Sequence, residues 1–172
     1  MKTTKGLVIV NTGKGKGKTT AALGMMLRAW GHDKKVVMLQ FVKHSIVGEH
    51  RAAQRMGVEI VAGGAGFTAR ENNTEKNERM AKELWKLATE KINSGRYDMV
   101  ILDELTYVLK YGWLEIDRVV DVLRHRPSQI HVIITGRTAP QALIDFADTA
   151  VEIIDIKHHH RQKIKAQAGI EF

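Results

Sequence analysis

The fold of this chain is decided by one stretch near its start, Leu7-Val8-Ile9-Val10-Asn11-Thr12-Gly13-Lys14-Gly15-Lys16-Gly17-Lys18-Thr19-Thr20. The first four residues are apolar and mostly β-branched, which predicts a buried parallel strand. The glycine- and lysine-rich loop that follows ends in Gly17-Lys18-Thr19, which matches the end of the phosphate-binding signature G-x-x-x-x-G-K-[ST]. Apolar residues from position 20 to 30 recur at helical spacing. Strand, loop and helix in this order are the context that the signature requires, so we predict a P-loop.

The chemistry of such a loop follows from its residue types. Glycines let consecutive backbone N–H groups turn towards phosphate oxygens, and the helix that begins there adds its positive dipole end. The first glycine falls at position 13 instead of 12, so the loop is one residue tighter than the general signature. The alternative interpretation is a flexible basic surface turn. We predict that the phosphates are bound by Gly13, Lys14, Gly15, Lys16, Gly17, Lys18, Thr19 and Thr20, with Lys18 as a catalytic charge.

The remainder of the chain continues the alternation of strands and helices. Strands are expected at 36–41, 58–61, 99–102, 130–135 and 151–156, and helices at 77–93 and 114–123. Thr138-Ala139-Pro140-Gln141 is expected to form a capping box with proline in the first turn of a further helix. The pattern predicts an α/β fold of the P-loop NTPase (RecA-like) type, with a mostly parallel central sheet covered by helices on both faces. We expect residues 1–172 to form a single P-loop α/β domain.

An acidic pair follows the expected strand at 99–102. Apolar residues that end in Asp103-Glu104 place carboxylates at the edge of the sheet where ligands of parallel sheets bind. A carboxylate beside a nucleotide can hold Mg²⁺, so we predict that Thr19 and Glu104 bind the metal. Glu104 is also a candidate general base, which makes it a second catalytic residue, and the sequence leaves both roles open. An ordinary strand-end acid that caps a neighbouring helix is the simplest alternative.

Composition excludes several other classes of protein. The chain has no cysteine, so disulfides and thiolate chemistry are absent. We expect no membrane-spanning segment and a cytoplasmic location. The formal charge of +8 is typical of proteins that bind anions, but the clustered loop lysines favour a polyphosphate over nucleic acid. We interpret His158-His159-His160 as a solvated basic loop at the mouth of the site, because adjacent histidines do not share one face of a regular element.

Taken together, motifs in order along almost the whole chain resemble those of the ATP:corrinoid adenosyltransferases. The segment from Thr12 to Ala22 looks like their tightened P-loop, and Asp103-Glu104-Leu105-Thr106-Tyr107 is similar to their acidic strand end. The other matching segments are Arg28-Ala29-Trp30-Gly31-His32, Gln40-Phe41-Val42-Lys43, Gly48-Glu49, Gly66-Phe67-Thr68, Thr135-Gly136-Arg137, Lys157-His158 and Lys165-Ala166-Gln167-Ala168-Gly169-Ile170.

The resemblance implies transfer of the 5′-deoxyadenosyl group of ATP to the cobalt(I) of a corrinoid, with release of triphosphate, in the biosynthesis or salvage of adenosylcobalamin. It implies ATP as co-substrate, Mg²⁺ or Mn²⁺ as the metal, a homodimer, and a reduced flavoprotein as electron donor. Arg28 would contact phosphate, and the nucleotide would lie reversed relative to other P-loop enzymes. Phe67 would pack beneath the corrinoid, where this chain departs from better-known members by carrying Ala69 instead of a tryptophan.

Two other hypotheses compete with this one. A P-loop small-molecule kinase or ATPase would release ADP instead of triphosphate. A RecA-like nucleic-acid-binding ATPase, suggested by the positive charge, would bind DNA in a salt-sensitive way. In the favoured reaction cobalt(I) is itself the nucleophile, so no side chain has to remove a proton. The protein has to align the reactants and stabilise charge on the triphosphate.

Overall fold

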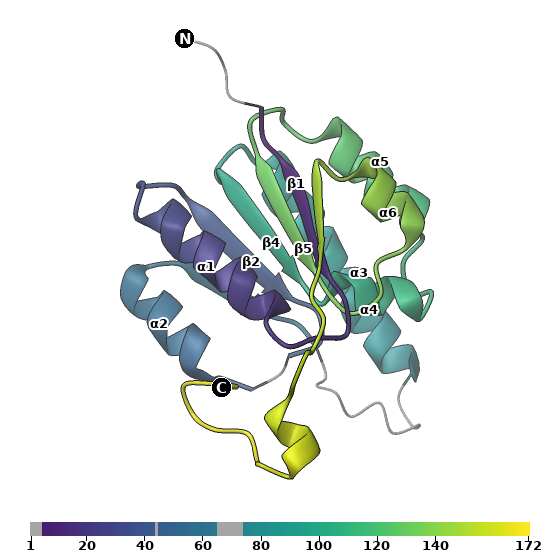
Figure 1. Ribbon diagram of the computed structural model, residues 1–172. Helices are drawn as coiled ribbons and strands as arrows, with labels where there is room; N and C mark the ends of the chain where they lie inside the picture. Colours follow the sequence, from purple (N-terminus) through teal and green to yellow (C-terminus); the bar gives the residue numbers. More distant parts are fainter. Residues whose placement is uncertain (1–4, 44, 65–73) are drawn as a thin grey trace.

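The computed structural model describes residues 5–43, 45–64 and 74–172, in which strands and helices alternate (Figure 1). The strands are β1 (Val8–Thr12), β2 (Val36–Gln40), β3 (Glu59–Ala62), β4 (Met99–Asp103), β5 (His131–Thr135) and β6 (Thr149–Glu152). The helices are α1 (Lys18–Trp30), α2 (Gly48–Met56), α3 (Thr74–Asn93), α4 (Leu105–Lys110), α5 (Ile116–His125), α6 (Gln141–Phe146) and the short 3-10 helix η1 (His159–Gln162).

The strands form one sheet in the order β3-β2-β4-β5-β1-β6, and every neighbouring pair is parallel. The four central strands are rich in fully buried β-branched and aliphatic residues, as expected for a sheet covered on both faces. In a parallel sheet all carboxyl ends lie at the same edge. The phosphate loop after β1 and the acidic end of β4 therefore meet at one edge, although β5 separates their strands.

Helices cover both faces of the sheet, which confirms the predicted α/β architecture (Figure 1). On one face α1 and α2 pack through a cluster that includes Ala22, Met26 and Ala53. On the other face α3, α4, α5 and α6 share a larger apolar cluster with the sheet. Among the described residues, no helix is both long enough and apolar enough to cross a membrane.

Three short elements have no clear signal in the sequence. In α2 only Ala53 is buried, so the helix lacks the apolar stripe from which a helix is predicted. Helix α4 has only six residues and begins directly behind β4, so its apolar residues look like a continuation of the strand. The 3-10 helix η1 has no buried residue. These elements are defined by their position against the sheet and not by their own periodicity.

Two predicted boundaries after β5 are wrong. Pro140 is the N-cap of α6 and not a first-turn residue, and no side chain caps this helix. The expected capping box is absent because α6 begins only at Gln141, whose side-chain amide donates to Asp145 at 2.8 Å. The backbone N–H of Ala139 donates to Oγ1 of Thr12 at 3.0 Å, which holds this segment against the phosphate loop. The last strand covers Thr149–Glu152 instead of 151–156, and all four of its residues are exposed at the edge of the sheet.

Candidate active site

The phosphate loop connects β1 to α1 through two glycines in conformations that other residues avoid. Gly13 has φ +102° and Gly17 has φ +119°, and α1 begins at Lys18, directly behind Gly17. The N–H of Gly15 donates to the carbonyl of Ile153 at 2.8 Å, which ties the loop to the chain beyond β6. The predicted order of strand, loop and helix is therefore present.

The two positive-φ glycines differ in how closely other backbone approaches them. A Cβ atom added at Gly13 would lie 2.3 Å from the carbonyl oxygen of Ile153, whereas nothing lies within 4 Å of one added at Gly17. We expect Gly17→Ala to lower the free energy of unfolding by about 1–3 kcal/mol through backbone strain alone. Gly13→Ala is expected to lower the free energy of unfolding by clearly more, because the backbone at Ile153 has to move as well. Urea unfolding without nucleotide measures both, and equal losses would contradict the close approach at Gly13.

Lys18 is tucked into the loop that it belongs to. Its side chain is only 6% exposed, and Nζ donates to the carbonyl of Gly15 at 2.5 Å. Burial lowers the pKa of Lys18, and the negative charge of Glu104 opposes this shift. In the described part of the chain this ammonium has no ion-pair partner at contact distance, so its charge is available to an anion in the loop.

Asp103 forms the centre of a buried polar cluster beside the loop. It is fully buried, and its Oδ1 accepts hydrogen bonds from the hydroxyls of Thr19 at 2.8 Å and Thr135 at 2.7 Å. Its Oδ2 accepts from Nε2 of Gln40 at 3.2 Å. Three neutral donors thus satisfy the carboxylate, and one of them is the hydroxyl that the sequence assigns to the metal.

Gln40 and Thr135 are site residues to which sequence reasoning assigned no role, and Asp103 was recognised as part of the acidic pair without a role of its own. Each is the last residue of its strand, in β2, β5 and β4 respectively. Gln40 and Asp103 are also direct partners in the register of the sheet. A polar residue that ends an otherwise apolar run in several strands is a signal that could have found them, because these ends meet at one edge.

Glu104 lies next to this cluster in a left-handed conformation, with φ +61°. Its N–H donates to Oγ1 of Thr135 at 2.9 Å, and its Oε2 is buried without a hydrogen-bond partner. Burial raises the pKa of Glu104, the charge of Asp103 raises it further, and Lys18 acts in the opposite direction. A buried carboxylate oxygen without a partner is well suited to receive a cation.

A cavity of about 830 Å³ lies between the phosphate loop, α2 and the C-terminal segment, residues 155–172. Its wall includes seven consecutive loop residues, 14–20, together with Glu104 and Arg137. The predicted residues Lys14, Gly15, Lys16, Gly17, Lys18, Thr19, Thr20 and Glu104 are therefore brought together around one space. Gly13 shapes the loop and does not line the cavity.

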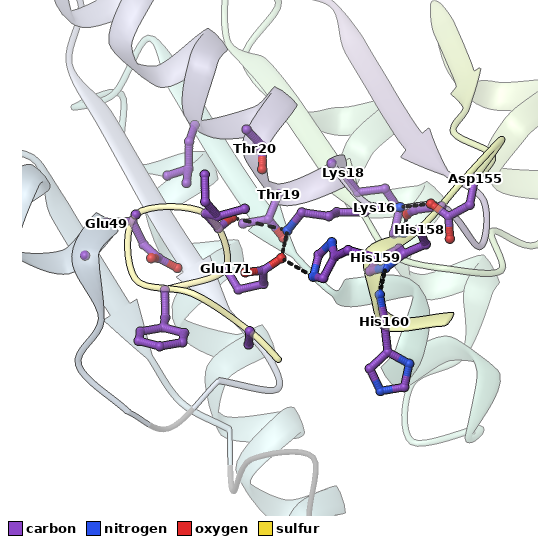
Figure 2. Close-up of a pocket in the computed structure, with 18 of the residues that line it drawn as sticks. Lys16, Lys18, Thr19, Thr20, Glu49, Asp155, His158, His159, His160 and Glu171 are labelled. Carbon is purple, nitrogen blue, oxygen red and sulfur yellow. Dashed lines mark hydrogen bonds and ion pairs between the residues drawn. The ribbon is translucent and has the colours of Figure 1, made fainter. Parts of the chain in front are cut away.

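The C-terminal segment forms the opposite wall of this cavity. Figure 2 shows Lys16, His159 and Glu171 facing one another, with Oε1 of Glu171 at 3.0 Å from Nζ of Lys16 and 3.1 Å from Nε2 of His159. Asp155 accepts the backbone N–H of Lys16 at 2.8 Å. A hydrogen bond from the backbone N–H of Gln167 and the ion pair with Lys16 lower the pKa of Glu171. The segment thus meets the loop through ionised carboxylates.

His158, His159 and His160 all line the cavity, in or next to η1. The N–H of His160 donates to Nδ1 of His158 at 3.1 Å, and only His159 reaches Glu171 (Figure 2). No group of three or more His, Cys, Asp or Glu side chains in residues 5–43, 45–64 and 74–172 is placed to hold a metal ion.

The two remaining predicted site residues are Arg28 and Phe67. Arg28 lies exposed in the last turn of α1, ten residues beyond Lys18, which corresponds to about 15 Å along the helix axis. It does not line the cavity, and its phosphate contact stays a prediction. Phe67, with its neighbour Ala69, lies outside the described residues.

Comparisons with known proteins address the family directly. The model of the family described as ATP:corrinoid adenosyltransferase BtuR/CobO/CobP matches residues 4–172. The corrinoid adenosyltransferase of Escherichia coli (strain K12) is 42% identical over 169 residues, which are 98% of this chain and 86% of the relative. That of Pseudomonas aeruginosa is 39% identical over 171 residues, 98% of this chain and 84% of the relative. Corrinoid adenosyltransferase CobA of Salmonella typhimurium is 40% identical over 169 residues, with shares of 98% and 86%.

Among solved structures, the flagellar accessory protein FlaH of Methanocaldococcus jannaschii shares the fold, with a TM-score of 0.59 at 10% identity. The match covers 86% of this chain and 70% of FlaH. At this identity the likeness concerns the fold alone. The family match extends from the phosphate loop through the acidic end of β4 to the C-terminal wall of the cavity, so the chain belongs to the ATP:corrinoid adenosyltransferase family.

Proposed function

We propose that this protein transfers the 5′-deoxyadenosyl group of ATP to the cobalt(I) of a corrinoid and releases triphosphate. The observation that carries the proposal is the phosphate loop beside the Asp103 cluster, in a chain that matches the adenosyltransferase family over residues 4–172. Cobalt(I) supplies the electron pair for the new cobalt–carbon bond at C5′. The bond between C5′ and the α-phosphate oxygen breaks, and its electrons leave with the triphosphate.

The residues of the cavity match the charge changes of this reaction. Negative charge grows on the departing triphosphate, where the ammonium of Lys18 and the loop N–H groups other than those of Gly13, Gly15 and Lys16, which are bonded within the fold, are placed to stabilise it. No proton has to be removed from cobalt(I), so the reaction needs no general base. The buried carboxylate of Asp103 accepts the Thr19 hydroxyl and thereby fixes its orientation. These roles are proposals drawn from the positions of the groups.

The oxygen atoms beside the loop fit Mg²⁺, or Mn²⁺ in its place. The hydroxyl of Thr19 and the unpartnered Oε2 of Glu104 are hard oxygen donors at the edge of the cavity. Mg²⁺ in phosphate sites takes one or two protein groups and fills its other positions with phosphate oxygens and water. We propose that Thr19 and Glu104 hold the ion, which when bound supplies positive charge for the triphosphate.

The decisive experiment identifies both products. The protein is incubated with ATP, Mg²⁺ and a chemically reduced corrinoid, and the light-sensitive adenosylated corrinoid is followed by absorbance while the released phosphates are separated by ion exchange. We expect one triphosphate for each adenosylated corrinoid. Release of ADP without adenosylation would instead indicate the kinase or ATPase alternative.

Substitutions of the proposed metal ligands are expected to raise the metal requirement. Thr19→Val and Glu104→Gln each remove one ligand, so the Mg²⁺ concentration for half-maximal activity is expected to rise about 10- to 100-fold. Titration of activity with Mg²⁺ at saturating ATP measures this value. Glu90→Gln, an exposed substitution with the same charge change on α3, is the matched control.

A different outcome would assign Glu104 another role. If Glu104 were a general base, Glu104→Gln would lower turnover at every Mg²⁺ concentration without shifting the requirement. Wild-type turnover would then rise with pH through the raised pKa of Glu104, because only the ionised carboxylate accepts a proton. That combination would contradict the metal role and favour hydrolysis.

The assembly and surroundings of the enzyme are further parts of the proposal. We infer a single domain over residues 1–172, a homodimer, a cytoplasmic location and a reduced flavoprotein that supplies electrons to the corrinoid. The continuous sheet that joins β1 to β6 supports the single domain. The family resemblance supports the dimer, the location and the electron donor. Analytical ultracentrifugation tests the dimer, and cobalt reduction by a purified flavodoxin tests the electron donor.

A further inference from the structure

A second, smaller cavity lies beside the phosphate loop. It has a volume of about 180 Å³ and is formed by the loop, the start and end of α4 and the residues that follow β5. Its lining residues are Lys14, Thr106, Tyr107, Lys110, Arg137 and Thr138. Lys14 and Arg137 also line the large cavity, so the two spaces share a wall.

All charged side chains that line the small cavity are positive. Three of its six lining residues are cationic, and none is acidic. Lys14, Lys110 and Arg137 are exposed, and none of the three cationic groups has an ion-pair partner in the part of the chain that the structure describes. Arg137 interacts with Glu104 at longer range, but no carboxylate of the described residues contacts any of the three cations, so together they attract an anion.

A buried hydroxyl provides a second, independent observation. Thr106 lines the same cavity, its side chain is only 1% exposed, and its Oγ1 has no hydrogen-bond partner. A buried hydroxyl left without a partner costs about 1–3 kcal/mol, so such groups are usually satisfied. Gly136 leaves room for this hydroxyl, because a Cβ atom there would lie 1.9 Å from Oγ1. An oxyanion in the cavity would accept its proton.

The size of the cavity restricts the ligand. About 180 Å³ accommodates a carboxylate or phosphate group but not a nucleoside. We place the triphosphate of ATP in the large cavity, and the ribose and adenine of ATP carry no further charge. Among the two substrates, this leaves the corrinoid, whose rim bears side chains that end in carboxylates or amides and, in cobalamin, a nucleotide loop with one phosphate.

We propose that the small cavity is an oxyanion subsite for the corrinoid, in which Lys110, Lys14, Arg137 and the Thr106 hydroxyl bind a peripheral carboxylate or the nucleotide-loop phosphate. This inference rests on the proposed function. The subsite makes the enzyme prefer corrinoids with a negative group on the rim over fully amidated ones. The preference decreases at high ionic strength, because the three cations are exposed to solvent.

The test compares three corrinoids that differ in the negative groups on their rim, and the Lys110→Gln variant separates this difference from their other structural differences. Cobyrinic acid carries free carboxylates, cobalamin carries the phosphate, and cobinamide carries neither. The KM of each reduced corrinoid is measured at saturating ATP for the wild type, for Lys110→Gln, and for Lys86→Gln as a control of equal charge change at an exposed position of α3. Binding of the unreactive cobalt(III) forms is measured without ATP by equilibrium dialysis.

We expect the wild type to bind one charged corrinoid about three- to tenfold more tightly than cobinamide, and which one it is identifies carboxylate or phosphate as the ligand. Lys110→Gln is expected to reduce this ratio towards one, and Lys86→Gln to retain it. Thr106→Val, which removes only the buried hydroxyl, is expected to reduce the ratio in the same direction.

A wild type without preference would overturn the subsite. A preference that Lys110→Gln leaves unchanged would overturn it as well, and a higher KM for ATP in that variant would then make the small cavity an extension of the triphosphate site. Failure of the proposed function would look different from failure of the subsite. No corrinoid would then be adenosylated, while equilibrium dialysis would still measure corrinoid binding at the subsite.

Discussion

Replacement of Lys18 by alanine is expected to lower turnover by roughly 30- to 1,000-fold, the equivalent of about 2–4 kcal/mol of transition-state stabilisation. The ammonium of Lys18 has no ion-pair partner in the described structure and faces the space enclosed by the loop. Its charge becomes most useful when negative charge develops on the leaving triphosphate. The loss should therefore appear in kcat and not only in the KM for ATP.

The folded protein is expected to tolerate this substitution. Burial lowers the pKa of Lys18, which means that its charge is unfavourable in the ligand-free fold. Thermal unfolding without ATP should consequently begin at a temperature no lower than that of the wild type. Lys86→Ala, at an exposed position of α3, is the control and should retain full turnover. Near-normal kcat in Lys18→Ala would remove the loop lysine from the mechanism.

Asp103→Asn is expected to produce the second large loss, about 10- to 100-fold in activity. Asp103 does not itself line the large cavity, so its effect acts through Thr19, which does and whose hydroxyl donates to Asp103 at 2.8 Å. An asparagine side chain has one oxygen, whereas the aspartate accepts three hydrogen bonds with two. One buried donor then loses its acceptor, at a cost of about 1–3 kcal/mol in the free energy of unfolding.

A double-mutant cycle separates this positioning role from a general loss of stability. Thr135→Val removes a second contact of Asp103, together with the acceptor of the Glu104 N–H, and leaves Thr19 in place. If the cluster acts as a unit, Thr135→Val and Asp103→Asn together should cost much less activity than the sum of their separate effects. Asp145→Asn, exposed on α6, is the matched control. Full activity with an unchanged Mg²⁺ requirement in Asp103→Asn would rule out orientation of Thr19 by this carboxylate.

Those parts of the fold that consecutive residues encode could be predicted without the structure. The apolar run before Gly13, the glycine spacing and the helix behind Lys18 together predict the phosphate loop, and the structure confirms its order of strand, loop and helix. The alternation of strands and helices likewise predicts the parallel sheet, because a crossover helix is needed to return the chain to a parallel strand. The acidic end of β4 was visible for the same reason, as a carboxylate pair directly behind a buried strand.

Which of these residues contact one another followed only from the folded chain. Nothing near Gln40 or Thr135 in the sequence shows that both donate to Asp103, because their strands become neighbours only when the sheet forms. The same holds for Lys16 and Glu171, separated by almost the whole chain, and for the cations around the small cavity. Local patterns report which face of an element is apolar, whereas contacts between elements depend on strand order and on the path of the chain. Periodicity therefore located the loop and the sheet, and the packed edge of the sheet assembled the site.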